Sequence, residues 1–188
     1  MGMDDREEIL LLGDPRLRQV CRPVTDFESE EFRESGRRLT NALERFRSEH
    51  GFGRAIAAPQ IGIPLRMIAM NLGEGSLLLV NPELTNPSIE RFKLWDDCMS
   101  FPWLLVRLER YVSVDLRYRD EGGELILRER VERDVSELLQ HEVDHLDGIL
   151  ALDRALDRDS IIARQVYLGR KSHFDSLVDY VIRPTIRT

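Results

Sequence analysis

The chain has 188 residues, of which 42% are apolar and 32% are charged, and its net charge is −7. This composition is typical of one folded globular domain and excludes a disordered chain. The acidic balance argues against a surface built to bind nucleic acid, and no apolar run approaches the ~20 residues that a membrane helix needs.

No repeat or linker divides the sequence, so we expect a single domain over residues 1–188 with a C-terminal helical extension at 154–188. That extension carries seven Arg or Lys against four Asp, whereas residues 1–153 hold the acidic excess. A basic tail of this kind can contact ribosomal RNA weakly, although a solvated helix face is the simpler interpretation. We expect neither membrane association nor specific DNA binding, and the oligomeric state stays open.

The first residues are acidic, unlike the basic start of a secretory signal, and the cytoplasm is therefore the expected location. The chain has two cysteines, Cys21 and Cys98, which are too few for a disulfide framework.

Residues 30–48 place apolar side chains at helical spacing and predict an amphipathic helix. Residues 66–71 and 77–80 are short apolar runs separated by glycines, which is typical of two strands joined by a turn. Residues 111–118 alternate between apolar and polar and predict one half-buried strand, and Gly122 and Gly123 then turn the chain into a second strand at 124–131.

A second helix is expected over residues 135–147, because Asp134 and Glu137 resemble a capping box and Gly148 can end the helix. Near the end of the chain, apolar residues at helical spacing predict a further helix over 174–181 that Pro184 terminates. Strands dominate the first two thirds and long helices flank them, so the fold class is α+β.

The helix at 135–147 contains the pattern HExxH as His141, Glu142 and His145. Residues four apart on a helix share one face, so both imidazoles can bind a single metal ion while the glutamate reaches a water on that metal. The pattern lies between apolar residues, which predicts a buried helix whose polar groups need partners. The residues therefore favour a metal site over two exposed histidines.

A third ligand is needed, and the sequence offers several. The extended HExxHxxGxxH pattern has Ala151 at its third histidine position and is excluded. Asp153 and Asp157 could contribute carboxylates, and His173 is the only later histidine. Cys98 is the best candidate, because a thiolate is a strong ligand for zinc or ferrous iron.

Three blocks carry a resemblance to a known family. Residues 53–62 read GRAIAAPQIG, residues 96–100 read DDCMS, and residues 140–148 read QHEVDHLDG. They are similar in order and spacing to the G-x-G-x-A-A-P-Q, E-G-C-L-S and Q-H-E-x-D-H-L-x-G blocks of the peptide deformylases, and the likeness extends over about residues 9–153. The resemblance implies antiparallel sheets packed around a central helix that bears HExxH, with a C-terminal helix.

The resemblance also implies roles for residues at matching positions. Cys98, His141 and His145 would bind one divalent metal, natively Fe²⁺, with Zn²⁺, Ni²⁺ or Co²⁺ able to replace it. The metal would lower the pKa of a water from about 15.7 to roughly 7. The catalytic residues would be a general base and two donors to the oxyanion of the formyl group, namely Glu142 as the base and Gln60 and the Met99 N–H as the donors.

The implied reaction is hydrolysis of the N-formyl group of formyl-methionyl peptides during protein biosynthesis and N-terminal processing, with release of formate. The chain departs from the family at three positions near the substrate, where it has Arg54, Ala55 and Asp97. Together with Gly53, these are the substrate-binding residues that we expect. An arginine near the substrate leaves two alternatives open, a divergent deformylase for a polar or acidic formylated compound and a catalytically idle metal-binding relative. Arg107 is similar to an arginine often found after the cysteine block.

Overall fold

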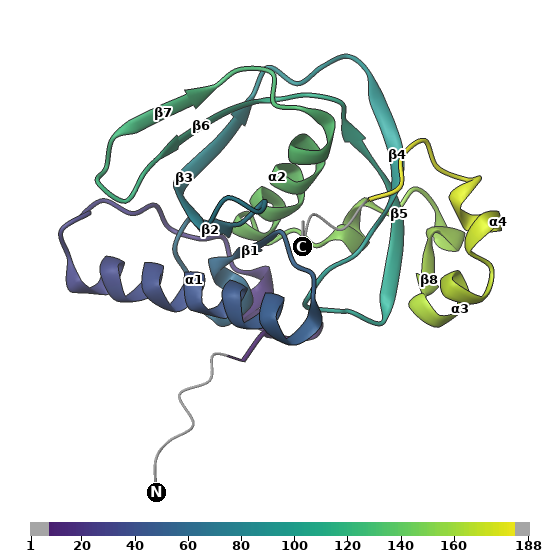
Figure 1. Cartoon of the computed structure of the whole chain (residues 1–188), viewed down its shortest axis with the longest axis horizontal. Helices are drawn as coiled ribbons and strands as arrows, with labels where there is room; N and C mark the ends of the chain where they lie inside the picture. The colour runs from purple at the N-terminus through teal and green to yellow at the C-terminus, as the bar shows by residue number, and fades with distance from the viewer. Residues whose placement is uncertain (1–7, 183–188) are drawn as a thin grey trace, which may run out of the picture.

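The computed structural model describes residues 8–182, which form two antiparallel sheets around a central helix (Figure 1). The larger sheet has the strand order β1-β2-β3-β6-β7 and the smaller sheet has the order β4-β5-β8. The strands are β1 (Ala55–Ala57), β2 (Met67–Met70), β3 (Leu77–Thr85), β4 (Arg91–Asp96), β5 (Leu104–Tyr111), β6 (Asp115–Arg119), β7 (Leu125–Arg128) and β8 (Ile161–Ala163).

Two long helices cover opposite faces of the larger sheet, and two short ones follow near the C-terminus. These helices are α1 (Glu30–His50), α2 (Arg133–Leu146), α3 (Arg164–Gly169) and α4 (Lys171–Asp175). None of the helices in the described range is long and apolar enough to cross a membrane. The expected class, α+β with antiparallel sheets around the helix that bears HExxH, is confirmed.

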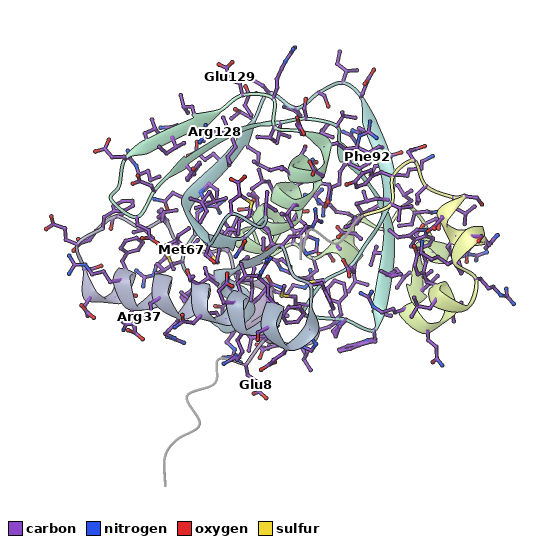
Figure 2. The ribbon with its side chains drawn as sticks, viewed as in Figure 1. Glu8, Arg37, Met67, Phe92, Arg128 and Glu129 are labelled. Carbon is purple, nitrogen blue, oxygen red and sulfur yellow. The ribbon has the colours of Figure 1, made fainter. Side chains whose placement is uncertain are left out.

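The sequence explains why α1 and α2 lie where they do. In α1, Phe32, Leu39 and Leu43 form an apolar stripe that packs on the larger sheet, and Figure 2 shows Met67 of β2 in the interior and Arg37 on the outer side of α1. On the other face of that sheet, Leu138 and the neighbouring apolar residues of α2 pack against β1, β2 and β6. Helix α2 is therefore enclosed between the two sheets.

The strand predicted over residues 111–118 is divided between the two sheets. Strand β5 ends at Tyr111 and β6 begins at Asp115, so the intervening residues cross from one sheet to the other. The main chain of Tyr111 is bound by side chains of α2, because its N–H donates to Gln140 and its carbonyl accepts from Ser136. These contacts replace the strand hydrogen bonds that the alternating pattern predicts.

The predicted start of α2 is also corrected. The helix begins at Arg133 with Glu132 as its N-cap, and Glu137 does not close a capping box. Its side chain is buried and faces Arg54 instead. The predicted end is borne out, because Gly148 follows the helix with a φ of +71°. A Cβ at this glycine would lie 2.5 Å from the carbonyl oxygen of Arg18.

The helix predicted over residues 174–181 is wrong beyond Asp175, where α4 ends. The chain then runs alongside β4, and the N–H groups of Asp179 and Tyr180 both donate to the carbonyl of Lys93. Tyr180 packs edge-on against Phe92 at 5.5 Å between ring centroids. Pairing with an exposed strand edge takes the place of the helical hydrogen bonds that the apolar spacing predicts.

Candidate metal centre

Helix α2 and the turn after β4 bring three metal-ligating side chains to one buried point. The ligand atoms of Cys98, His141 and His145 all lie within 4.8 Å of one another. The two imidazoles project from the same face of α2 with ring centroids 5.0 Å apart, as the spacing of HExxH predicts. The thiol sulfur of Cys98 is 3.3 Å from Nε2 of His145.

The cysteine is positioned by a tight turn that follows β4. The carbonyl of Cys98 accepts from the N–H of Phe101, which is fully buried and fixes the turn to the core. The N–H of Ser100 points at the sulfur from 3.4 Å. The turn therefore holds the sulfur beside two hydrogen-bond donors, the Ser100 N–H and the Gln60 amide.

Gln60 approaches the same sulfur from the short 3-10 helix Ala58–Ile61, which joins β1 to β2. Its carbonyl oxygen accepts from the N–H of Ala57 at 2.9 Å, which orients the amide. The Nε2 group then lies 3.6 Å from the Cys98 sulfur and 3.3 Å from the hydroxyl of Ser100. The amide hydrogens of Gln60 are therefore held at the edge of the three-residue cluster.

A series of buried ionic contacts begins at Nδ1 of His141. Nδ1 of His141 is 3.0 Å from Asp96, which accepts from Arg110 at 3.1 Å, and Arg110 in turn lies 2.5 Å from Asp144. Burial raises the pKa of Asp96, but His141 and Arg110 outweigh it and hold this pKa well below its usual range. Because Asp96 engages Nδ1, the Nε2 atom of His141 is the one left for a metal.

The two histidines differ in their electrostatic surroundings. Burial lowers the pKa of His141, but the Asp96 carboxylate outweighs burial and holds it well above its usual value. Burial and the neighbouring His141 charge both lower the pKa of His145 well below its usual value. A neutral imidazole is the form that binds a metal, so the lowered pKa of His145 favours coordination.

Two buried polar atoms at this point have no hydrogen-bond partner within residues 8–182. They are Oε2 of Glu142 and Nδ1 of His145. Burial raises the pKa of Glu142 to about 7. An unpaired carboxylate oxygen is costly in a protein interior, and the Glu142 oxygen beside a soft sulfur and two imidazole donors fits a borderline divalent ion such as Fe²⁺ or Zn²⁺. Nδ1 of His145 takes no part in this fit, because Nε2 is the atom of that ring that faces Cys98.

The cluster opens into a cavity of about 610 Å³. All of the residues that the sequence predicts for the site, except His145, line this cavity, including Gly53, Ala55 and Met99. Gly53 has a φ of +123°, and a Cβ there would lie 3.1 Å from the end of the Met99 side chain. A side chain at position 53 would therefore narrow the approach to the cluster.

Arg54 and Asp97, the two charged residues that differ from the family pattern, each form an ion pair in the structure. The Arg54 guanidinium lies 2.6 Å from Glu137, and only 12% of its side chain is exposed. Asp97 does not neutralise Arg54 by direct contact but lies 2.7 Å from Arg164. Arg54 therefore faces the cavity as half of an ion pair and not as an isolated cation.

Sequence reasoning missed Arg110 and assigned no role to Asp96. Both residues are 97% buried or more, and the signal for Arg110 is its position at alternating spacing after Val106 and Leu108, on the inward face of β5. Arg107 lies on the other face of β5 and forms an ion pair with Asp157 at 3.0 Å. It lies outside the series of ionic contacts that begins at His141.

A thiol and two imidazoles around one point, with an unpaired carboxylate beside them and a cavity in front, are typical of a catalytic metal centre in a hydrolase. The polypeptide deformylase family model matches residues 6–160, and the chain belongs to this family.

Relatives of known sequence and structure agree with this assignment. A peptide deformylase of Thermotoga neapolitana is 34% identical over 159 residues, which cover 84% of this chain and 92% of that protein. The crystal structure of the Thermotoga maritima peptide deformylase has a TM-score of 0.72 at 32% identity and covers 80% of this chain and 98% of its own. A peptide deformylase of Synechococcus elongatus, solved with actinonin, has a TM-score of 0.73 at 28% identity, with 88% and 85% covered.

Proposed function

We propose that the protein hydrolyses the N-formyl group of formyl-methionyl peptides, with a divalent metal held by Cys98, His141 and His145. The observation that carries this proposal is the meeting of these three buried side chains with Glu142 and Gln60 at the base of one cavity. Membership of the deformylase family supports the reaction class.

A divalent metal held by Cys98, His141 and His145 would supply Lewis acidity and would lower the pKa of a water to roughly 7. The donor set of one sulfur and two nitrogens suits Fe²⁺, Zn²⁺, Ni²⁺ and Co²⁺, and we propose Fe²⁺ as the native ion. Asp96 and Arg110 would keep Nε2 of His141 turned toward it, since they hold the other ring nitrogen.

Glu142 is the general base in this proposal. Its unpaired Oε2 accepts a proton from the attacking water, whose oxygen bonds to the formyl carbon. The amide of Gln60 and the N–H of Met99 donate to the formyl oxygen as negative charge develops on it, which typically contributes about 3 kcal/mol. Glu142 then returns the proton to the amine as the C–N bond breaks, and formate and a free amine leave.

The peptide has a place to bind beside this centre. Strand β1 is at an edge of the larger sheet, and Gly53, Arg54 and Ala55 at its start line the cavity. An extended peptide can pair with such an edge through main-chain hydrogen bonds. Arg54 already contacts Glu137 at 2.6 Å, and this pairing favours formyl-methionyl peptides over the polar or acidic alternative.

We further propose a cytoplasmic location and a weak ribosome contact through residues 154–188. Three basic side chains of that segment are already paired, because Arg154, Arg164 and Lys171 contact Asp144, Asp97 and Asp175. We therefore expect a contact of low affinity that weakens with salt.

The test is formate release from formyl-Met-Ala and formyl-Glu-Ala by anaerobically prepared protein, compared with Glu142→Gln. Wild type should prefer the methionyl peptide. Glu142→Gln should keep the metal and lose about 10²–10⁴-fold in kcat, because an amide cannot accept the proton. Glu132→Gln, on the exposed N-cap of the same helix, is the control and should behave as wild type. More than a tenth of wild-type activity in Glu142→Gln would reject the general base.

A further inference from the structure

The family match ends at residue 160, yet the cavity is also lined by residues beyond it. We call residues 164–182 the C-terminal segment. Its cavity-lining residues are Arg164, Tyr167, Val178, Tyr180, Val181 and Ile182. Part of the wall in front of the metal cluster therefore comes from chain that the family model does not include.

The first part of the segment is fixed to the cysteine turn. Arg164 contacts Asp97 at 2.7 Å, and its Nε donates to the carbonyl of Pro102 at 2.6 Å. The indole N–H of Trp95 donates to the carbonyl of Phe174 at 2.9 Å. Asp97, which stands where the family has glycine, thus anchors the segment next to Cys98.

The last part of the segment lies along the outer edge of β4. The N–H of Lys93 donates to the Asp179 side chain at 2.8 Å, and Tyr180 forms a parallel bridge with Leu94. Because the bridge is parallel, Val181 and Ile182 run in the same direction as the end of β4, toward the cysteine turn. Figure 1 shows this stretch crossing β4 from the short helices toward the centre of the molecule.

The chemistry of this wall is apolar. Val181 is 39% exposed although it is aliphatic, and it lies beside Tyr180, whose ring packs on Phe92. The charged groups that line the cavity near it are paired, Arg164 with Asp97 and Arg54 with Glu137, and the Arg133 guanidinium lies 5.9 Å from the Tyr180 ring centroid. An apolar side chain bound here would remove this exposed surface from water, whereas a charged one would lose hydration without gaining a partner.

The Cys98–His141 end of the cavity is buried more deeply than the C-terminal segment, and this difference indicates which part of a substrate contacts the segment. His141 and Cys98 are at most 6% exposed, so the formyl group must bind deep in the cavity. Val181 and Arg164 are about a third exposed or more, so they contact parts of the peptide nearer to solvent.

We propose that the C-terminal segment is a specificity-determining wall that selects an apolar side chain in the peptide residue following the formylated methionine. This inference rests on the proposed deformylase function and deepens it. It assigns Val181 as the residue whose side chain meets the substrate and Arg164 and Asp97 as positioning residues that hold the wall in place.

The test replaces Val181 with residues of opposite charge. Val181→Asp should raise the ratio of kcat/KM for formyl-Met-Lys over formyl-Met-Leu by roughly fivefold or more, because the aspartate attracts the substrate lysine. Val181→Lys should lower the same ratio, because it repels the substrate lysine. The matched control is Leu168→Asp, which places the same charge on an exposed part of the segment that does not line the cavity. Its ratio should stay within about twofold of wild type.

The proposal is contradicted if Val181→Asp and Val181→Lys have the same ratio of kcat/KM for formyl-Met-Lys over formyl-Met-Leu. It is also contradicted if Leu168→Asp shifts that ratio as much as Val181→Asp does. If the charged variants do not fold, Val181→Ser replaces them in the test. It should lower kcat/KM for formyl-Met-Leu relative to formyl-Met-Ser. An unchanged ratio in this variant also contradicts the proposal. Formate release from formyl-Met-Ala by wild type is measured in parallel. Activity without the charge-dependent shift rejects the wall alone, whereas no formate release by wild type rejects the deformylase function and the wall together.

Discussion

At the scale of single residues, Asp96 organises the charges around the metal cluster. It stands at the acidic position of the cysteine block, it is buried, and it contacts both His141 and Arg110. A carboxylate so placed fixes which ring nitrogen of His141 faces the cluster. Its neighbour Asp97, one residue along the chain and on the other side of the strand end, serves the C-terminal segment instead.

The Arg54–Glu137 pair is a second residue-scale feature, and its stability can be predicted. Burial raises the pKa of Glu137 to about 7, against the pull of Arg54, so at pH 8 both groups are charged. Arg54→Leu or Glu137→Leu alone leaves a buried charge without its partner and should cost about 3 kcal/mol in the free energy of unfolding, measured by urea denaturation at pH 8. The double change to leucine should cost less than either single change.

The exposed pair of Arg117 and Glu83 provides the control for that experiment. Both side chains are more than half exposed, so removing either should change the free energy of unfolding by less than about 1 kcal/mol. Additive losses in the double variant of Arg54 and Glu137 would mean that the two residues do not interact.

At the scale of elements, the end of α2 depends on Gly148. Its φ of +71° and the 2.5 Å approach to the Arg18 carbonyl leave no room for a side chain. Gly148→Ala should lower the free energy of unfolding by about 2 kcal/mol or more, measured by thermal melting. Gly169→Ala is the matched control, because nothing lies within 4 Å of a Cβ at that position. An equal loss in both variants would contradict this role for Gly148.

The elements also show what local sequence can predict. Helix α1 was predictable because an apolar stripe marks it. Helix α2 was predicted from its ends, and Gly148 marks one of them correctly, whereas the capping box expected at the start does not form. Strand β5 was not predicted, since its buried face includes Arg110, whose partners come from β4 and α2. The course of residues 176–182 was also missed, because the edge of β4 that they pair with is more than 80 residues away in sequence.

In the candidate site, too, local motifs predicted some residues, whereas contacts between distant parts of the chain were missed. Cys98, His141 and His145 were selectable from motifs, and the structure brings them together. Glu137 was read as a helix cap because its distance along the chain from Asp134 suits that role, yet its partner is Arg54, from a different element. Pairings of this kind depend on tertiary contacts that periodicity does not contain.

At the scale of the whole molecule, the cluster of Cys98, His141 and His145 joins parts of the fold that are otherwise separate. Cys98 follows the smaller sheet, both histidines lie on α2, and Gln60 reaches the cluster from the short 3-10 helix between β1 and β2. A ligand that binds only the folded chain stabilises it, by about 4 kcal/mol at a free concentration ~1,000 times its dissociation constant. Removing the metal with a chelator should therefore lower the melting temperature by roughly 10 °C, and adding Fe²⁺ or Zn²⁺ should restore it.

The metal content of two cysteine variants tests the proposed metal site directly. Cys21 and Cys98 are both buried and free, but only Cys98 lies in the cluster. After anaerobic loading and desalting, elemental analysis of Cys21→Ala should find about one ion per chain, as in wild type, whereas Cys98→Ala should have lost most of it together with formate release. A full complement of metal in Cys98→Ala would place the third ligand elsewhere and contradict the account.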